Sequence, residues 1–159
     1  MSRSILVVVP CGSAKIWDRH PCHGPTPARD AYIGSPFVVN RQYAEHFGSE
    51  WRILSAKFGL VASDFLIPEA YNVSFKRRST GPITPDELRM QVQDQQLDAF
   101  ETVVGLGGKE YRSMVEQAFA LPASRVIFPF AGLPLGLGMA AVKDAIRRNI
   151  LIPAAHEPV

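Results

Sequence analysis

The residues with the clearest chemical potential follow a short aliphatic run, Ile5–Val9, near the start of the chain. The next six residues, Pro10–Lys15, read PCGSAK. A Gly-Ser turn in this position can aim backbone N–H groups at an anion, and the lysine adds a positive charge. The turn is neither a P-loop, because the Gly-Lys-Ser/Thr ending is absent, nor Gly-x-Gly-x-x-Gly. It is therefore either an anion-binding loop or a tight turn with a surface lysine.

Cys11 within this turn could act as a nucleophile if a helix N-terminus or a neighbouring base activates the thiol. The alternative is a small buried residue that fills space at the end of a strand. Cys11, His20, Cys22 and His23 are close in sequence, but their spacing fits no standard zinc pattern. We therefore expect no metal and no cofactor, and both thiols are expected to be reduced.

A second group of candidates precedes a predicted helix over residues 38–47. Arg29 could bind an anion and Tyr32 could stack on a base. Ser35 is explained by helix capping, with Pro36 at the first helical position.

A third group follows the second predicted strand, which ends at Ser55. Ser55 and Lys57 leave that strand end, and Glu69 and Tyr71 lie farther along a segment, Ala56–Tyr71, that we predict to be irregular. A lysine and a carboxylate that meet here could perform acid–base chemistry or bind a polar ligand. The alternative is a salt bridge beside a packed tyrosine. Two glycine-rich turns, Gly105–Lys109 and Pro129–Gly136, allow a phosphate or base to approach closely, unless they are turns alone.

The elements that must position these residues alternate along the chain. Strands are predicted at 5–9, 51–55, 102–104 and 125–128, and helices at 38–47, 85–99 (after the Thr84 N-cap), 109–119 and within 132–149. This order predicts a single α/β domain over residues 1–152, with an open, mostly parallel, Rossmann-like sheet and helices on both faces. Residues 153–159 are predicted to be a flexible tail. Ligands of such sheets bind at the carboxyl ends of the strands, so Cys11, Lys15, Ser55, Lys57 and Gly107 should surround one pocket.

Composition narrows the class of protein. The 159 residues are 47% hydrophobic and 20% charged, which is enough to fill one core, and the net charge is +2. That charge permits an anionic ligand without specifying nucleic acid. No stretch approaches the ~20 apolar residues of a membrane span, so a cytoplasmic protein without membrane contact is expected.

Several of these segments together resemble the YaaA (peroxide stress protein) family, and most closely its small bacterial and phage relatives. The shared pattern of that group is C-x-x-x-K after the first strand, A-x-x-L/A-Y-x-G-S/T-x-x-F, LSAK-x-GL, a Pro-Tyr-like step, G-x-x-Y on a helix and P-L/F-x-GL-x-x-G near the end. The corresponding segments here are Cys11–Lys15, Ala28–Phe37, Leu54–Leu60, Ala70-Tyr71, Gly108–Tyr111 and Pro129–Gly136. The resemblance implies DNA binding and a role in oxidative stress. Pro10-Cys11 with Lys15 is also similar to the Pro-Cys-x-x-x-Lys element of archaeosine synthase, in which the lysine amine reacts at a 7-deazaguanine base in tRNA.

Taken together, the residues and the resemblance predict a domain that binds a nucleotide, a modified nucleobase or a DNA or RNA strand, and that acts on the base or the glycosidic bond. Lys15 and Glu69 are the predicted catalytic residues. The predicted ligand-binding residues are Cys11, Gly12, Ser13, Arg29, Tyr32, Ser55, Lys57, Tyr71, Gly107 and Gly108. One alternative is a non-catalytic DNA-binding stress protein that uses Lys76-Arg77-Arg78, predicted to be exposed and mobile, and Arg147-Arg148. Another is a redox sensor that uses Cys11 and Cys22.

Overall fold

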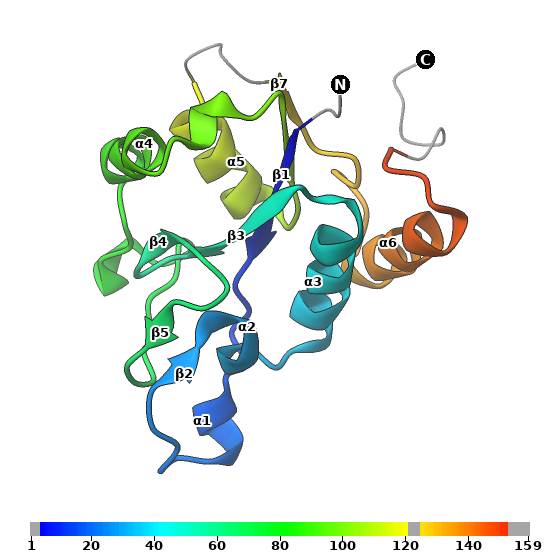
Figure 1. The fold of residues 1–159 in the computed structure, drawn as a ribbon. Coiled ribbons are helices and arrows are strands. Elements are labelled where there is room, and N and C mark those ends of the chain that lie inside the picture. The colour runs from blue at the N-terminus through cyan, green and yellow to red at the C-terminus, as the bar shows by residue number, and fades with distance from the viewer. Residues whose placement is uncertain (1–3, 121–124, 153–159) are drawn as a thin grey trace.

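A twisted five-stranded sheet forms the centre of the computed structural model, which describes residues 4–120 and 125–152 (Figure 1). Its strands are β1 (Ile5–Pro10), β3 (Glu50–Ser55), β4 (Gly59–Val61), β6 (Thr102–Gly105) and β7 (Arg125–Ile127). They lie in the order β4-β3-β1-β6-β7, with β4 antiparallel to β3 and every other pair parallel. The predicted tail over 153–159 lies outside the described residues. No helix in the described ranges is long and apolar enough to cross a membrane.

The central strand, β1, explains why both faces of the sheet are covered. Val8 pairs with Arg52 on one side and Gly105 on the other, and Leu6–Val9 are all buried. Because side chains alternate along a strand, Val7 and Val9 enter one core cluster while Leu6 and Val8 enter another. A continuous aliphatic run is what a strand buried on both faces requires.

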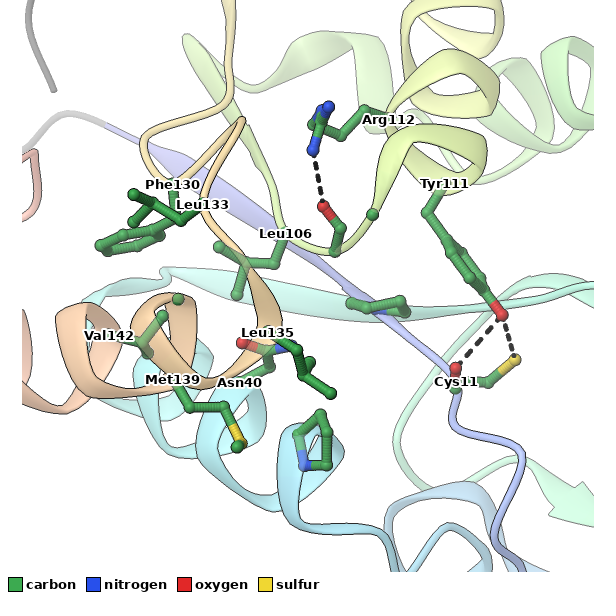
Figure 2. A pocket seen from close by; sticks show the side chains of 15 residues that line it. Cys11, Asn40, Leu106, Tyr111, Arg112, Phe130, Leu133, Leu135, Met139 and Val142 are labelled. Atoms are coloured by element: carbon green, nitrogen blue, oxygen red, sulfur yellow. Dashed lines mark hydrogen bonds between the residues drawn. The ribbon is translucent and has the colours of Figure 1, made fainter.

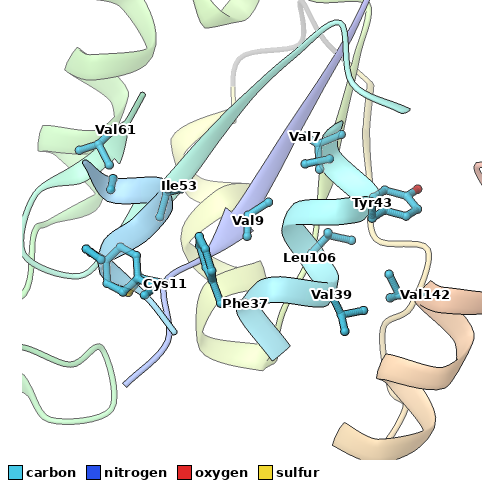
Figure 3. Close-up of a cluster of buried hydrophobic side chains, with 14 of the residues drawn as sticks. Val7, Val9, Cys11, Phe37, Val39, Tyr43, Ile53, Val61, Leu106 and Val142 are labelled. Carbon is cyan, nitrogen blue, oxygen red and sulfur yellow. The ribbon is translucent and has the colours of Figure 1, made fainter. Parts of the chain in front are cut away.

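Two pairs of helices cover these two cores. On one face lie α3 (Ser35–Phe47) and α6 (Leu135–Arg148), and on the other α4 (Pro85–Asp94) and α5 (Lys109–Ala118). Tyr43 of α3 lies wholly in the first core, where its hydroxyl donates to the Leu151 carbonyl at 2.7 Å (Figure 3). The expected α/β fold, with an open, mostly parallel sheet and helices on both faces, is confirmed.

The prediction that Ala56–Tyr71 is irregular was wrong. It contains β4 and the short β5 (Leu66–Ile67), which pairs with β2 (Thr26–Pro27). The segment between β1 and α3 holds β2 and two four-residue helices, α1 (Ile16–Arg19) and α2 (Ala28–Ala31). Gly59 turns the chain into β4 with a φ of +80°. The outer edge of β4 is then hydrogen-bonded by two glutamines of α4: Gln91 accepts from Leu60 N at 2.7 Å, and Gln95 donates to Leu60 O at 2.9 Å. These bonds occupy an edge that would otherwise be open to pairing.

Three helix details also differ from the prediction. Gly34, not Ser35, is the N-cap of α3, and Ser35 lies inside the helix without a capping side-chain bond. Val38, the first residue of the helix predicted over residues 38–47, lies within α3 and is 43% exposed. The helix that was expected to reach Ala99 ends at Asp94, because Gln96 adopts the left-handed conformation before a short 3-10 turn over Leu97–Ala99.

Candidate functional site

The strand order places a crevice between β1 and β6. The chain leaves β1 towards α3 on one face of the sheet, whereas it leaves β6 directly into α5 on the other face. The two connections diverge, and the space between them is the topological switch point at which open α/β sheets bind ligands.

A cavity of about 280 Å³ occupies this point (Figure 2). Pro10 and Cys11 contribute one part of its wall after β1, and Leu106–Gly108 contribute another after β6. The remaining lining residues come from α3, α5, the chain leading into α6 and α6 itself: Pro36, Asn40, Tyr111, Arg112, Phe130, Leu133, Leu135, Gly138, Met139 and Val142. The volume is near the lower end of the range of roughly 300–1,000 Å³ for small-molecule sites.

Gly107 is what allows the two loops to approach each other. Its φ of +106° lies in the region that only glycine adopts readily, and a Cβ there would lie 2.7 Å from the Pro10 Cγ. The glycine-rich sequence after β6 is therefore needed for the geometry of this turn.

Cys11 and Tyr111 connect the β1 loop to α5. The Tyr111 hydroxyl donates to the Cys11 carbonyl at 3.2 Å and lies 3.4 Å from the Cys11 Sγ (Figure 2). Burial raises the pKa of Tyr111 above its ordinary value, and the nearby Cys11 raises it further, so the phenol stays neutral. Tyr111 also packs edge-on against Phe75, with ring centroids 5.4 Å apart.

A chain of hydrogen-bonded hydroxyl groups joins Tyr32, Tyr71 and Ser55. Tyr71 Oη is 2.5 Å from Tyr32 Oη and 2.8 Å from Ser55 Oγ. Burial raises the pKa of Tyr32 to about 12 and raises that of Tyr71 as well, with Cys11 contributing to both. Tyr32 and Tyr71 are therefore neutral hydrogen-bonding hydroxyls at physiological pH.

Two lysines meet at the ring of Tyr71. Lys15 Nζ lies 4.5 Å and Lys57 Nζ 5.6 Å from its centroid. Lys15 is only 8% exposed, and its ammonium donates one hydrogen bond, to the Ser13 carbonyl at 3.3 Å. Neither lysine forms an ion pair with a carboxylate in the described parts of the chain. A buried ammonium without a counter-ion is costly, so this place favours an anion.

Residues 6–144, from β1 to α6, match the model of a family of unknown function, DUF6884. The chain belongs to the DUF6884 family. The uncharacterized protein YfjM of Bacillus subtilis (strain 168) is 42% identical to it over 110 residues, which are 69% of this chain and 73% of that protein. No solved structure matches.

The structure of this DUF6884 protein brings some of the predicted site residues together and separates others. Lys15, Lys57, Tyr32, Ser55 and Tyr71 form one polar cluster. Ser13 contributes a carbonyl to it, and Gly12 lies in the same turn. Cys11, Gly107 and Gly108 line the cavity instead. The residues that were expected to surround one pocket are thus divided between the cavity and a separate polar cluster.

Two predicted residues, Glu69 and Arg29, belong neither to the cavity lining nor to the polar cluster. Glu69 is exposed and forms no hydrogen bond or ion pair with the described residues, so its carboxylate does not meet Lys57 as we had expected. The Arg29 guanidinium lies 3.7 Å from the Asp30 carboxylate, and Arg29 lines a surface hollow that Arg41 and Tyr32 also line. Arg29 lies on α2, directly after β2, and Glu69 follows β5; sequence patterns did not reveal the pairing of these two short strands.

Three polar residues of the cavity lining were not among the predicted site residues: Asn40, Tyr111 and Arg112. The resemblance had included Tyr111 in its G-x-x-Y step, which was the available signal. Asn40 and Arg112 lie on amphipathic helices, whose polar residues ordinarily face solvent, so nothing in the sequence marks them as cavity residues. In the described ranges, no three His, Cys, Asp or Glu side chains gather closely enough to hold a metal ion.

Proposed function

We propose that this DUF6884 protein binds a nucleotide or nucleobase at the carboxyl edge of its sheet. The observation that carries the proposal is the cavity at the topological switch point, between the loops that follow β1 and β6. Its volume of about 280 Å³ suits a single base or nucleoside better than a larger ligand.

The walls of the cavity suit a flat heteroaromatic ring. Leu106, Phe130, Leu133 and Met139 supply apolar and aromatic surface, and few polar groups interrupt it. A base gains free energy by stacking on such surfaces whatever its sequence context, and the few polar groups then determine its orientation.

The lysine pair supplies the place for a phosphate. Lys15 and Lys57 approach the same Tyr71 ring beside Cys11, which itself lines the cavity. A phosphate here would give the buried Lys15 ammonium its counter-ion and would gain charge-assisted hydrogen bonds.

Chemistry on the bound base or its glycosidic bond is the alternative role for Lys15, in which a neutral Lys15 amine that holds no phosphate would be the reacting group. Glu69 is too exposed to act as its acid–base partner without movement of the loop. The geometry therefore supports binding more directly than turnover. Chromatography of nucleosides and nucleotides after incubation with the protein tests turnover, and unchanged substrates would restrict the function to binding.

Thermal unfolding with a panel of nucleoside monophosphates and free bases tests the binding proposal. A ligand present at 100 times its Kd stabilises the folded state by about 2.7 kcal/mol, which is a Tm increase of roughly 5–10 °C for a chain of this size. Gly138→Leu places a side chain in the cavity from α6, where a Cβ meets only Leu133 at 3.9 Å, and it should abolish the increase.

Gly136→Leu is the matched control for the cavity-filling variant. It adds the same side chain to the same helix at an exposed position with open space around it, outside the cavity lining. It should retain the ligand-induced increase in Tm. No increase with any ligand, or equal increases in both variants, would count against the cavity as the site.

A nucleic-acid strand is the second candidate ligand, which the exposed basic loop favours. Lys76, Arg77 and Arg78 are exposed and form no ion pair with the described residues. Phe75, which precedes them, packs against Tyr111 of the cavity. Arg78 also lines a second hollow, of about 590 Å³, together with Lys109. A backbone could therefore follow cations that lie beside the cavity.

The salt dependence of binding separates this candidate from the first. Replacement of all three loop cations with alanine should lower the slope of log K against log salt for a single-stranded oligonucleotide by about 2, because about 0.7 counterion is released per phosphate contact. Binding of a mononucleotide should stay unchanged. An unchanged slope would leave the loop as a solvated turn.

A further inference from the structure

The polar cluster around Tyr71 gathers two positive charges for which the described parts of the chain supply no carboxylate within ion-pair distance. Lys15 is 8% exposed, and its ammonium has three N–H groups but one hydrogen-bond acceptor among the described residues, the Ser13 carbonyl at 3.3 Å. Lys57 brings a second ammonium to the same ring, 5.6 Å from its centroid. The unused donors of a buried ammonium favour a ligand that supplies negative charge and several acceptors.

The polar cluster is closed on one side and open on the other. The Tyr71 hydroxyl is hydrogen-bonded to Tyr32 and Ser55, which are 2% and 0% exposed, so this end of the ring is enclosed by the core. The open side bears Lys57 and Ser13, which are both exposed. The flexible stem of Lys57 lets its ammonium approach an anion that enters from this side. Such a place accepts the end of a ligand, whereas the middle of a chain needs both a way in and a way out.

We infer that the lysine pair binds a terminal phosphate, so that the ligand is a phosphomonoester and not an internal phosphodiester; this inference rests on the phosphate site of the proposed function. A phosphomonoester carries a charge of about −1.5 to −2 at pH 7 and has three free acceptor oxygens, which match the two ammonium groups. A phosphodiester carries a single charge and would leave one ammonium uncompensated. A free nucleotide meets this requirement at its phosphate, and a nucleic-acid strand meets it only at a phosphorylated end.

Calorimetric titration with methyl phosphate and with dimethyl phosphate tests the inference without a base. The wild-type chain should bind methyl phosphate roughly 10- to 100-fold more tightly than dimethyl phosphate, because the second negative charge adds a charge-assisted hydrogen bond. Lys15→Gln and Lys57→Gln each remove one ammonium, and each should lower this ratio of affinities to about 1. Lys76→Gln removes an exposed lysine outside the polar cluster and should leave the ratio unchanged.

The outcomes distinguish this inference from the proposed function. Equal affinities for the two esters, a ratio that survives both cluster substitutions, or no binding of methyl phosphate would refute the terminal-phosphate site, whatever the nucleotide panel shows. Selective binding of methyl phosphate without a Tm increase from any nucleotide or base would retain this site and refute the nucleotide proposal. Thermal unfolding of each variant without ligand checks the fold, and Lys57→Gln, at an exposed position, decides the test if Lys15→Gln does not fold.

Discussion

Ser55 offers the sharpest stability test of the polar cluster. Its side chain is 0% exposed, and its Oγ accepts from the backbone N–H groups of Lys57 and Phe58 at 3.2 and 3.1 Å. The same oxygen is 2.8 Å from the Tyr71 hydroxyl. Ser55→Ala removes all three interactions and changes the packing volume by only one oxygen atom.

The magnitude follows from these three bonds. An intramolecular hydrogen bond contributes about 0.5–1.5 kcal/mol net, and a buried partner left without a bond costs about 1–3 kcal/mol. Lys57 is exposed, so its backbone N–H can form a hydrogen bond to water instead, which limits the loss of unfolding free energy. We expect Ser55→Ala to lower the free energy of unfolding by about 2–4 kcal/mol, which corresponds to a Tm decrease of roughly 5–15 °C.

Urea unfolding followed by circular dichroism measures this change by linear extrapolation. The control is Ser113→Ala, an exposed serine on α5 whose Oγ accepts only from Gln117 at 3.2 Å, and its loss should stay within about 0.5 kcal/mol. A loss for Ser55→Ala as small as that of the control would refute the hydroxyl chain as a structural element.

Three further predictions concern other parts of the molecule. Burial raises the pKa of Tyr32 from 10.0 to about 12 and also raises the pKa values of the other three tyrosines. The free energy of unfolding should therefore keep its full value below pH 10 and should fall as pH rises towards 12. A phenolate absorbance change near pH 10 in the folded protein would contradict this prediction. Gly105→Ala should lower the free energy of unfolding by about 1–3 kcal/mol, because the new Cβ would lie 2.5 Å from Phe128. Gly138→Ala within α6 should instead raise the free energy of unfolding by about 0.5–1 kcal/mol. Chemical denaturation measures both changes, and equal effects would refute the packing of Gly105 against Phe128. Lys15→Ala should lower nucleotide affinity far more than Cys11→Ser by calorimetry, and the reverse order would favour thiol chemistry and the redox alternative.

The fold could be predicted because its strands and helices carry strong local signals. The aliphatic run of β1 and the capping box between Thr84 and Glu87 each specify an element without reference to distant residues. The strands β4 and β5 could not be predicted, because they are two or three residues long. The strand β4 depends on Gly59 and on the bond from Leu60 N–H to Gln91, 31 residues away, and β5 depends on its pairing with β2.

The candidate site was predicted only in part for the same reason. The rule that ligands bind at the carboxyl edge of parallel strands located Lys15 and Lys57 near each other, since both follow such strands. The same rule could not place Glu69, which lies beyond two short strands on an exposed loop. It also could not find Asn40, because its position in the cavity follows from the packing of α3 against α6, about 100 residues later in the chain.

Amide chemical-shift mapping by NMR tests most directly whether the cavity at the switch point binds a nucleotide. During titration with adenosine monophosphate, the largest shifts should fall on Leu106–Gly108, Cys11 and the first turn of α5, with smaller shifts around Lys15. Titration of the Gly138→Leu variant should remove them. Shifts confined to residues 76–78, or no saturable shift at all, would contradict the account.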